Sequence, residues 1–266
     1  MKKIISLILV LVLGVFSVFG LSSCGNPNPE DTLVCGVTIV KNLNEKNADG
    51  TWTGFDTEFA TEVAKLLGMK VKFVEITWEQ KYNEVNSGAI DAIWNGFTAN
   101  SADNGIDRSE LVDFSYGYML NQQCIVVKAE NLEQFTSLDS LKNKTATAET
   151  GSAGQSFAEG IEGVTVTPVP TQQNTFMEVK SGAVQFAVVD IILAQNICGQ
   201  GDYSDLVIVE DIELESEIYA VGFKKGSELT AKVNQAIKTL EENGKLEELA
   251  VKYGFENVVR VMETIE

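Results

Sequence analysis

The pattern of apolar and polar positions changes its period repeatedly along the chain. Short apolar runs bounded by polar residues predict buried strands, as at Leu33–Ile39 and Ile90–Trp94. Between these two runs, Phe55–Leu67 has apolar residues at helical spacing, and Gly68 supplies a C-cap. Strands that alternate with helices in this way predict an α/β fold with mostly parallel sheets.

The same alternation continues almost to the end of the sequence. Further strands are predicted at Lys70–Ile76, Gln122–Val127, Thr145–Ala148, Val164–Val169, Phe186–Val189, Val207–Ile212 and Ile218–Phe223. Further helices are predicted at Glu79–Asn86, from Gln155 onward, and at Thr175–Lys180, Ile191–Ile197, Ser227–Asn243 and Leu246–Tyr253. The pattern gives no account of Phe255–Glu266.

A weak internal repeat indicates two similar halves. The segment Glu84–Ala89 recurs as Glu178–Ala183, and each copy precedes a predicted buried strand. Gly96 and Asp190 lie equally far beyond the glycine of each copy, at the carboxyl ends of equivalent strands. Ligands of open α/β sheets bind at such strand ends. We therefore predict two lobes with a ligand site between them.

The predicted division into lobes follows from these patterns. Residues 33–121 and 218–258 form lobe 1, residues 122–217 form lobe 2, and residues 259–266 are a C-terminal extension. The chain is expected to cross between the lobes near Leu120–Gln123 and again near Glu213–Glu217. Two crossings of this kind predict a hinge that closes on a ligand.

The first 23 residues have the pattern of a secretory leader. Lys2 and Lys3 precede the apolar run Ile4–Phe19, which is short for a membrane span. The run ends in Leu21-Ser22-Ser23-Cys24, which resembles a bacterial lipobox, in which the cysteine is lipidated. Residues 24–32 then form a polar tether. The alternative is a plain signal peptide with a chance cysteine.

Composition excludes several classes of function. The chain has 266 residues, enough for two domains, and a net charge of −18, which disfavours nucleic acid as a partner. It contains no histidine, which excludes Ser-His and Cys-His catalysis and most zinc sites, so we expect no metal and no cofactor. Cys35, Cys124 and Cys198 are expected as buried free thiols, with one disulfide left open.

Candidate chemistry lies in the stretch from residue 91 to residue 115. A polar loop is expected after the strand that ends at Trp94, and it carries Asn95, Gly96, Thr98 and Arg108. Carbonyl and hydroxyl oxygens accept hydrogen bonds from an ammonium, and a guanidinium fork fits a carboxylate. This set suits an α-amino acid. The alternative is an ordinary surface loop with a solvated arginine.

Three segments resemble a known family. Gly50–Asp56, Ser87–Thr98, and Arg108 placed before Asp113–Ser115 are similar to the extracellular solute-binding proteins of polar amino-acid ABC transporters. The resemblance covers roughly residues 33–255. It implies a two-lobed periplasmic-binding-protein fold of type II, in which a mostly parallel sheet flanked by helices forms each lobe.

The resemblance also implies a set of ligand-binding residues. Arg108 would bind the carboxylate of the ligand, and backbone N–H groups of Ser152 and Ala153 would assist it. Asp190, the Gly96 carbonyl and the Thr98 hydroxyl would bind the ammonium. The full predicted set is Val40, Asn95, Gly96, Thr98, Arg108, Ser152, Ala153 and Asp190. Ser152 and Asp190 have a second interpretation as helix N-caps.

Two features depart from the family pattern. The extra region Ala102–Ile106 lengthens the segment between Thr98 and Arg108. The aromatic residue that usually stacks on the ligand is expected near Val40, which is aliphatic, so Trp52 and Trp94 are candidate replacements.

The function expected from these features is that of an exported bacterial lipoprotein on the outer face of the cell membrane. It would capture a free amino acid, deliver it to ABC permease subunits, and act as a monomer. A neutral polar ligand is favoured, because only Arg108 and Asp190 are placed as charges in the cleft. The alternatives are an enzyme on the same fold, with Asp190 or Glu149 as acid or base, and a separate sensor subunit.

Overall fold

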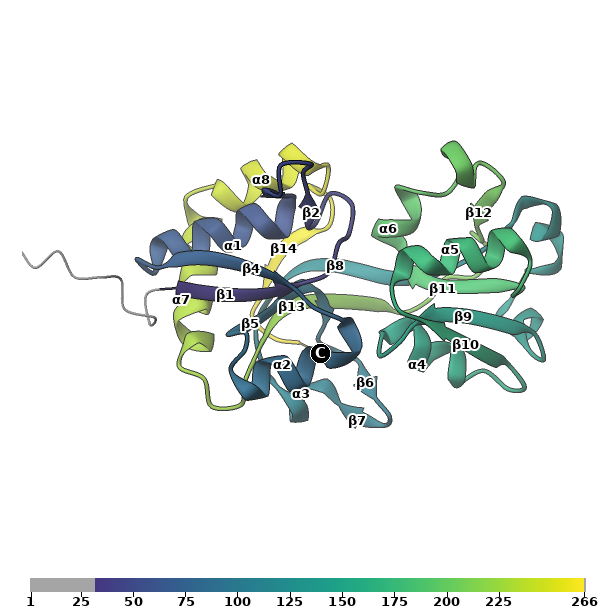
Figure 1. The fold of residues 1–266 in the computed structure, drawn as a ribbon, viewed down its shortest axis with the longest axis horizontal. Helices are drawn as coiled ribbons and strands as arrows, with labels where there is room; N and C mark the ends of the chain where they lie inside the picture. Colours follow the sequence, from purple (N-terminus) through teal and green to yellow (C-terminus); the bar gives the residue numbers. More distant parts are fainter. Residues whose placement is uncertain (1–31, 266) are drawn as a thin grey trace, which may run out of the picture.

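The computed structural model describes residues 32–265, which form two lobes joined by two strands (Figure 1). Lobe 1 contains β1 (Thr32–Val37), β2 (Glu45–Lys46), β3 (Trp52–Thr53), α1 (Phe55–Leu66), β4 (Lys70–Glu75), η2 (Trp78–Gln80), α2 (Lys81–Ser87), β5 (Ala92–Thr98), β6 (Ala102–Asp103), β7 (Ile106–Asp107), α3 (Arg108–Leu111), α7 (Leu229–Glu242), α8 (Lys245–Tyr253) and β14 (Val259–Met262). Lobe 2 contains η3 (Ala129–Gln134), η4 (Leu138–Leu141), β9 (Thr145–Glu149), α4 (Ala153–Glu159), β10 (Thr165–Val169), α5 (Gln172–Ser181), β11 (Phe186–Asp190), α6 (Ile191–Gln195), η5 (Gly201–Tyr203) and β12 (Leu206–Ile208).

The two connecting strands are β8 (Asp113–Lys128) and β13 (Ser216–Phe223), which run from one lobe to the other (Figure 1). They pair with each other in antiparallel fashion, with Glu217 opposite Asn121. The strand order β10-β9-β11-β8-β13-β5-β1-β4 therefore passes through both lobes. This confirms the predicted two-lobed α/β fold. The exact lobe boundaries stay a prediction.

Helix packing in lobe 1 follows the predicted amphipathic pattern. α1 buries Phe59 and Val63, and the Phe59 ring meets Trp94 edge-on at a centroid distance of 5.4 Å. Burial of each large apolar side chain contributes roughly 1.5–3 kcal/mol. α1 and α8 lie above the sheet of lobe 1 in Figure 1, and α2 and α3 lie below it. This packing fixes the strand ends that face lobe 2.

The structure corrects the sequence prediction at β5. The strand continues through Asn95, Gly96 and Thr98, which the sequence had suggested to be a loop. Asn95 is polar but buried, because its side chain bonds to Thr38 and Asn44. A polar residue whose bonds are made by distant parts of the chain looks like a loop residue in the sequence alone.

Other elements were also missed. β8 is one strand of 16 residues rather than the segment Gln122–Val127 alone. The extra region before Arg108 folds into the β6–β7 hairpin, which leads directly into α3. Near the C-terminus, β14 pairs with β8, so four residues of the segment after Phe255 form a strand.

Several expectations concern the termini and the cysteines. The predicted leader and Cys24 lie outside the described residues, as does the tether apart from residue 32. Within residues 32–265, no helix is long and apolar enough to cross a membrane. Cys35, Cys124 and Cys198 are free thiols, and Cys198 is half-buried rather than fully buried.

Candidate ligand-binding site

A small cavity lies between the lobes, and residues of both lobes line it. Its wall contains every predicted ligand-binding residue except Val40. The lining residues are Trp78, Asn95, Gly96, Thr98, Arg108, Gln123, Glu149, Ser152, Ala153, Gln172 and Asp190. Residues far apart in the sequence are thus brought together at the strand ends where the sequence places a ligand.

The lobes are closed on each other in this conformation. The cavity volume is about 20 Å³, which is room for about one water. Direct hydrogen bonds cross from lobe to lobe, from Gln173 Nε2 to the Ile39 carbonyl (2.6 Å) and from Asn42 Nδ2 to Asn196 Oδ1 (3.0 Å). A ligand as large as an amino acid therefore has to enter through an opened cleft.

Gly96 shapes the lobe 1 side of the cavity. It has φ of 54°, and a Cβ atom at this position would lie 2.8 Å from the Tyr219 ring. Its N–H donates to Asp56, which is buried. The pairing of β5 with β13 also changes register in this region, next to Ala220. A bulge of this kind redirects backbone groups, here toward the cavity.

Thr98 is oriented by a buried carboxylate. Its hydroxyl donates to Glu217 Oε2 at 3.1 Å, so the remaining lone pairs of Oγ1 are free to accept a hydrogen bond. Glu217 also accepts from Asn121 and Gln123. Burial, followed by the nearby charge of Asp190, raises the pKa of Glu217 to about 7.

Asp190 stands at the first residue before α6 but makes no capping hydrogen bond. Its carboxylate instead accepts from the side-chain amides of Asn121, Gln123 and Gln172. Burial raises its pKa above the ordinary value, while the three amide donors counteract the shift. Of the two interpretations of Asp190, the geometry therefore matches a group of the cleft rather than a helix cap.

Ser152, unlike Asp190, acts as a helix N-cap. Its hydroxyl accepts from Gln155 N–H at 3.0 Å, so it is the N-cap of α4. Its own N–H donates to the Glu149 carbonyl at 3.1 Å. Of the two predicted backbone donors, Ala153 N–H is thus the one that no acceptor within residues 32–265 occupies.

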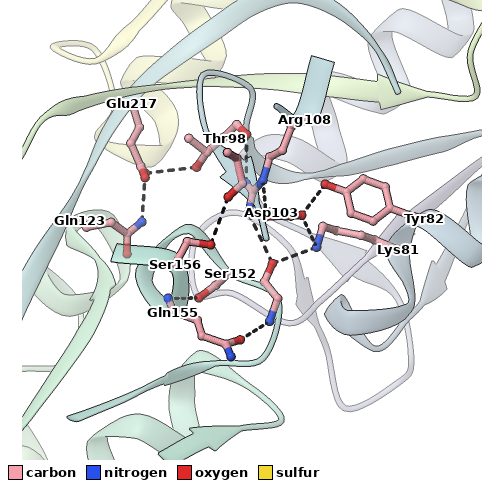
Figure 2. Close-up of polar contacts among 12 residues, drawn as sticks. Lys81, Tyr82, Thr98, Asp103, Arg108, Gln123, Ser152, Gln155, Ser156 and Glu217 are labelled. Atoms are coloured by element: carbon pink, nitrogen blue, oxygen red, sulfur yellow. Dashed lines mark hydrogen bonds and ion pairs between the residues drawn. The ribbon is translucent and has the colours of Figure 1, made fainter. Parts of the chain in front are cut away.

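Arg108 is not the exposed loop residue that the sequence suggested, because its side chain is only 1% exposed. Its Nε and Nη2 donate to Asp103 Oδ1 at 2.9 and 2.8 Å, and its Nη1 donates to the Thr98 carbonyl. Nη2 also reaches the Gly151 carbonyl of lobe 2 at 3.4 Å. Figure 2 shows this arrangement, in which the arginine is fixed by its own hairpin.

Lys81 is a second buried cation in the same cluster. Its Nζ donates to the Gly151 carbonyl at 2.9 Å and lies 3.4 Å from Asp103 Oδ2 (Figure 2). Burial, and then repulsion by Arg108, lowers the pKa of Lys81 to about 8. Burial alone would raise the pKa of Asp103, but the charges of Arg108 and Lys81 lower it below its usual value. The carboxylate thus stays ionised and fixes both cations.

The comparison with known proteins decides the family. The chain matches the model of the bacterial extracellular solute-binding proteins, family 3, over residues 34–257. It belongs to this family.

Three relatives illustrate the likeness of this solute-binding protein. The arginine-binding extracellular protein ArtP of Bacillus subtilis is 28% identical over 92% of the chain and 96% of that protein. A solved structure of an ancestral arginine-binding protein bound to arginine is 29% identical, with a TM-score of 0.76 over 84% of this chain and 98% of that one. An ancestral amino acid-binding protein, AncCDT-1, a precursor of cyclohexadienyl dehydratase, is 27% identical, with a TM-score of 0.73 over 84% and 96% of the two chains.

Sequence reasoning missed four residues of this solute-binding protein's cleft, and neither of its two candidate aromatic residues lines the cavity. Trp78 lines the cavity, whereas Trp94 is buried in the core and Trp52 packs against Phe73. The sequence feature that could have identified Trp78 is its position just beyond a strand that ends at the cleft. Gln123, Glu149 and Gln172 were missed as ligand-site residues, because none carries a local motif. Glu149 and Gln172 lie at the ends of β9 and α5, and Gln123 lies inside the long strand β8.

We expect Asp103→Ala to lower the free energy of unfolding by roughly 3–5 kcal/mol, because it leaves two buried cations without their carboxylate. Urea unfolding measures this. The matched control is Asp107→Ala, an exposed aspartate at the other end of the same hairpin, which should change stability by less than about 0.5 kcal/mol. Equal losses in the two variants would show that the buried cluster contributes nothing specific.

We expect the ligand-free protein to lose stability as the pH rises from 5 to 8. Burial raises the pKa of Glu149 from 4.5 to about 8, so in this window the unfolded chain has released a proton that the folded protein keeps. The free energy of unfolding then falls by up to roughly 1.4 kcal/mol per pH unit for this group. Urea unfolding at several pH values should show a shallower slope for Glu149→Gln than for wild type. The exposed Glu133→Gln serves as control, and an unchanged slope in Glu149→Gln would contradict the assignment.

Proposed function

We propose that this protein is the substrate-binding lipoprotein of an amino-acid ABC importer. The proposal rests on one observation: side chains of opposite charge line a single cavity between the two lobes. Arg108 of lobe 1 and Asp190 of lobe 2 both line it, together with the Thr98 hydroxyl. An α-amino acid carries a carboxylate and an ammonium on one carbon, and it requires this pair of partners.

Binding in this proposal replaces contacts that the closed protein makes with itself. The ligand carboxylate takes the place of the Gly151 carbonyl on the Arg108 Nη2 donor and also accepts from Ala153 N–H. The ammonium donates to Asp190, to the Gly96 carbonyl and to the free lone pairs of Thr98. Since the cavity is nearly filled, the hinge formed by β8 and β13 must open before binding and then close around the ligand.

The other parts of the proposal follow from the family. Lobe 1 comprises residues 33–121 and 218–258 and lobe 2 comprises residues 122–217, and the protein acts as a monomer. Lipidation at Cys24 anchors it outside the membrane, where it meets the permease subunits. Similar proteins are named as binding proteins. The dehydratase-related neighbour favours an enzyme as the second candidate, with Asp190 or Glu149 as acid or base.

One expectation about the ligand loses its basis. A neutral polar side chain was favoured because only Arg108 and Asp190 were placed as charges in the cleft. Glu149 also lines the cavity, so a neutral ligand is no longer favoured on that ground.

We expect at least one of the twenty amino acids to raise the melting temperature, because a ligand that binds the folded form stabilises it. Calorimetric titration with that amino acid should show binding without product formation, and Asp190→Asn should weaken it about 30-fold or more. The matched control is Asp202→Asn on the surface of lobe 2, which should bind like wild type. No response to any amino acid would contradict the proposed function, and turnover of the ligand would favour the enzyme.

We expect Cys24→Ala to release the protein into the soluble fraction or to leave an uncleaved precursor, because the acyl chains that anchor it cannot be attached. Cell fractionation and mass spectrometry of the N-terminus measure this outcome. Cys198→Ala is the control and should remain at the membrane. A Cys24→Ala protein that is processed and membrane-bound like wild type would rule out lipidation at this cysteine.

A further inference from the structure

Glu149 is a buried carboxylate that the binding of α-amino and α-carboxylate groups does not use. It is the last residue of β9, it is 4% exposed, and it lines the cavity beside Trp78 and Gln172. Within residues 32–265, no lysine or arginine forms an ion pair with it. A carboxyl group buried in this way keeps its proton in the closed cavity, and a cationic partner would favour its ionised form.

The neighbours of Glu149 bond mainly to other groups, although a side-chain hydrogen bond from Gln172 partly offsets the rise in the Glu149 pKa. The Gln172 amide bonds with Asp190 in both directions, since its Nε2 donates to the carboxylate and its Oε1 accepts from the backbone N–H. Lys81 contributes a favourable charge, but its Nζ bonds to the Gly151 carbonyl and pairs with Asp103. The cavity therefore presents a carboxylate in addition to those that an α-ammonium requires.

The position of Glu149 separates it from the ammonium site. β9 and β11 are neighbouring parallel strands, with Ala187 opposite Thr147, so Glu149 and Asp190 stand at the ends of adjacent strands. Adjacent strands lie about 4.8 Å apart. A ligand whose ammonium is held at Asp190 can therefore extend its side chain along the sheet edge toward Glu149. Trp78 lines the same cavity, but its ring already contacts the Lys81 ammonium, which lies 4.9 Å from the ring centroid, so Glu149 is the group left to meet a ligand cation.

We propose that Glu149 is the specificity-determining residue of this cleft and pairs with a positively charged ligand side chain. The ligand is then an α-amino acid with a terminal guanidinium or ammonium. This inference rests on the proposed function, because it requires that the cleft binds an α-amino acid at all.

Matched pairs of ligands test the side-chain charge in the wild-type protein. Arginine and citrulline have nearly the same shape, but citrulline carries a neutral urea group in place of the guanidinium. Norleucine has the carbon chain of lysine but lacks its terminal ammonium. Calorimetric titration should show that at least one cationic member binds about tenfold or more tightly than its neutral counterpart. The two pairs distinguish a guanidinium from an ammonium ligand.

A variant then assigns the preference to this residue. Glu149→Gln keeps the shape and removes the charge, so the preference for the cationic member should fall to within about threefold, while the neutral member binds as before. Glu133→Gln, on the surface of lobe 2, is the control and should keep the wild-type preference. Thermal unfolding checks that each variant is folded, and Glu149→Asp, which keeps the charge, should retain part of the preference.

Two results would overturn this inference, and they are distinguishable from failure of the proposed function. The inference is overturned if citrulline binds at least as tightly as arginine and norleucine at least as tightly as lysine. A cationic preference that survives in Glu149→Gln would assign it to another residue. Absence of binding by every amino acid would instead refute the proposed function itself.

Discussion

The antiparallel pairing of β8 with β13 is the constraint on which the rest of the structure depends. These strands are the two connections between the lobes, and they pair at Asn121 and Glu217, beside the cavity. Asn121 and Gln123 on β8 each donate to both Asp190 of lobe 2 and Glu217 of β13. The hinge and the proposed ammonium site are therefore parts of one hydrogen-bonded unit, so a change in one affects the geometry of the other.

Buried charge explains why closure should depend on a ligand. In the closed protein Glu149, Asp190 and Glu217 are removed from water, and burial raises the pKa of all three. Opening the cleft hydrates them, so repulsion and desolvation favour the open form when the three are ionised. A ligand shifts this equilibrium by its differential affinity for the two forms, and a group with positive charge among these carboxylates has such a preference for the closed form.

The sequence predicted the frame of the fold better than the surroundings of the site. Periodicity identified the long amphipathic helix α1 and the repeated strand-helix units, because apolar residues at regular spacing carry that information locally. The repeat also pointed to Gly96 and Asp190, which both line the cavity. The strand through Asn95 was missed because its buried polar side chain is satisfied by Thr38 and Asn44, far away in sequence.

The burial of Arg108 could not be predicted from the sequence for the same reason. Its burial depends on Asp103, which is close in sequence, but also on the Gly151 carbonyl of the other lobe. Glu149 and Trp78 were not predicted as ligand-site residues, because their roles come from where strand and helix ends meet in space. Local patterns specify elements, whereas the partners of a buried polar group depend on the complete fold.

In the proposed binding mode, the Gly151 carbonyl and the ligand carboxylate compete for the same donors. It accepts from Lys81 and from Arg108, so the lobes are held together by hydrogen bonds to a neutral oxygen. A ligand carboxylate offers a charged oxygen to these cationic donors, so it adds a charge–charge attraction that the neutral carbonyl lacks. Asp103 keeps the guanidinium in place during the exchange, so little rotamer freedom has to be lost on binding. The hairpin that lengthens this region relative to the family pattern thus fixes the arginine in advance. In the proposed binding mode, the ligand carboxylate then replaces the Gly151 carbonyl on this arginine.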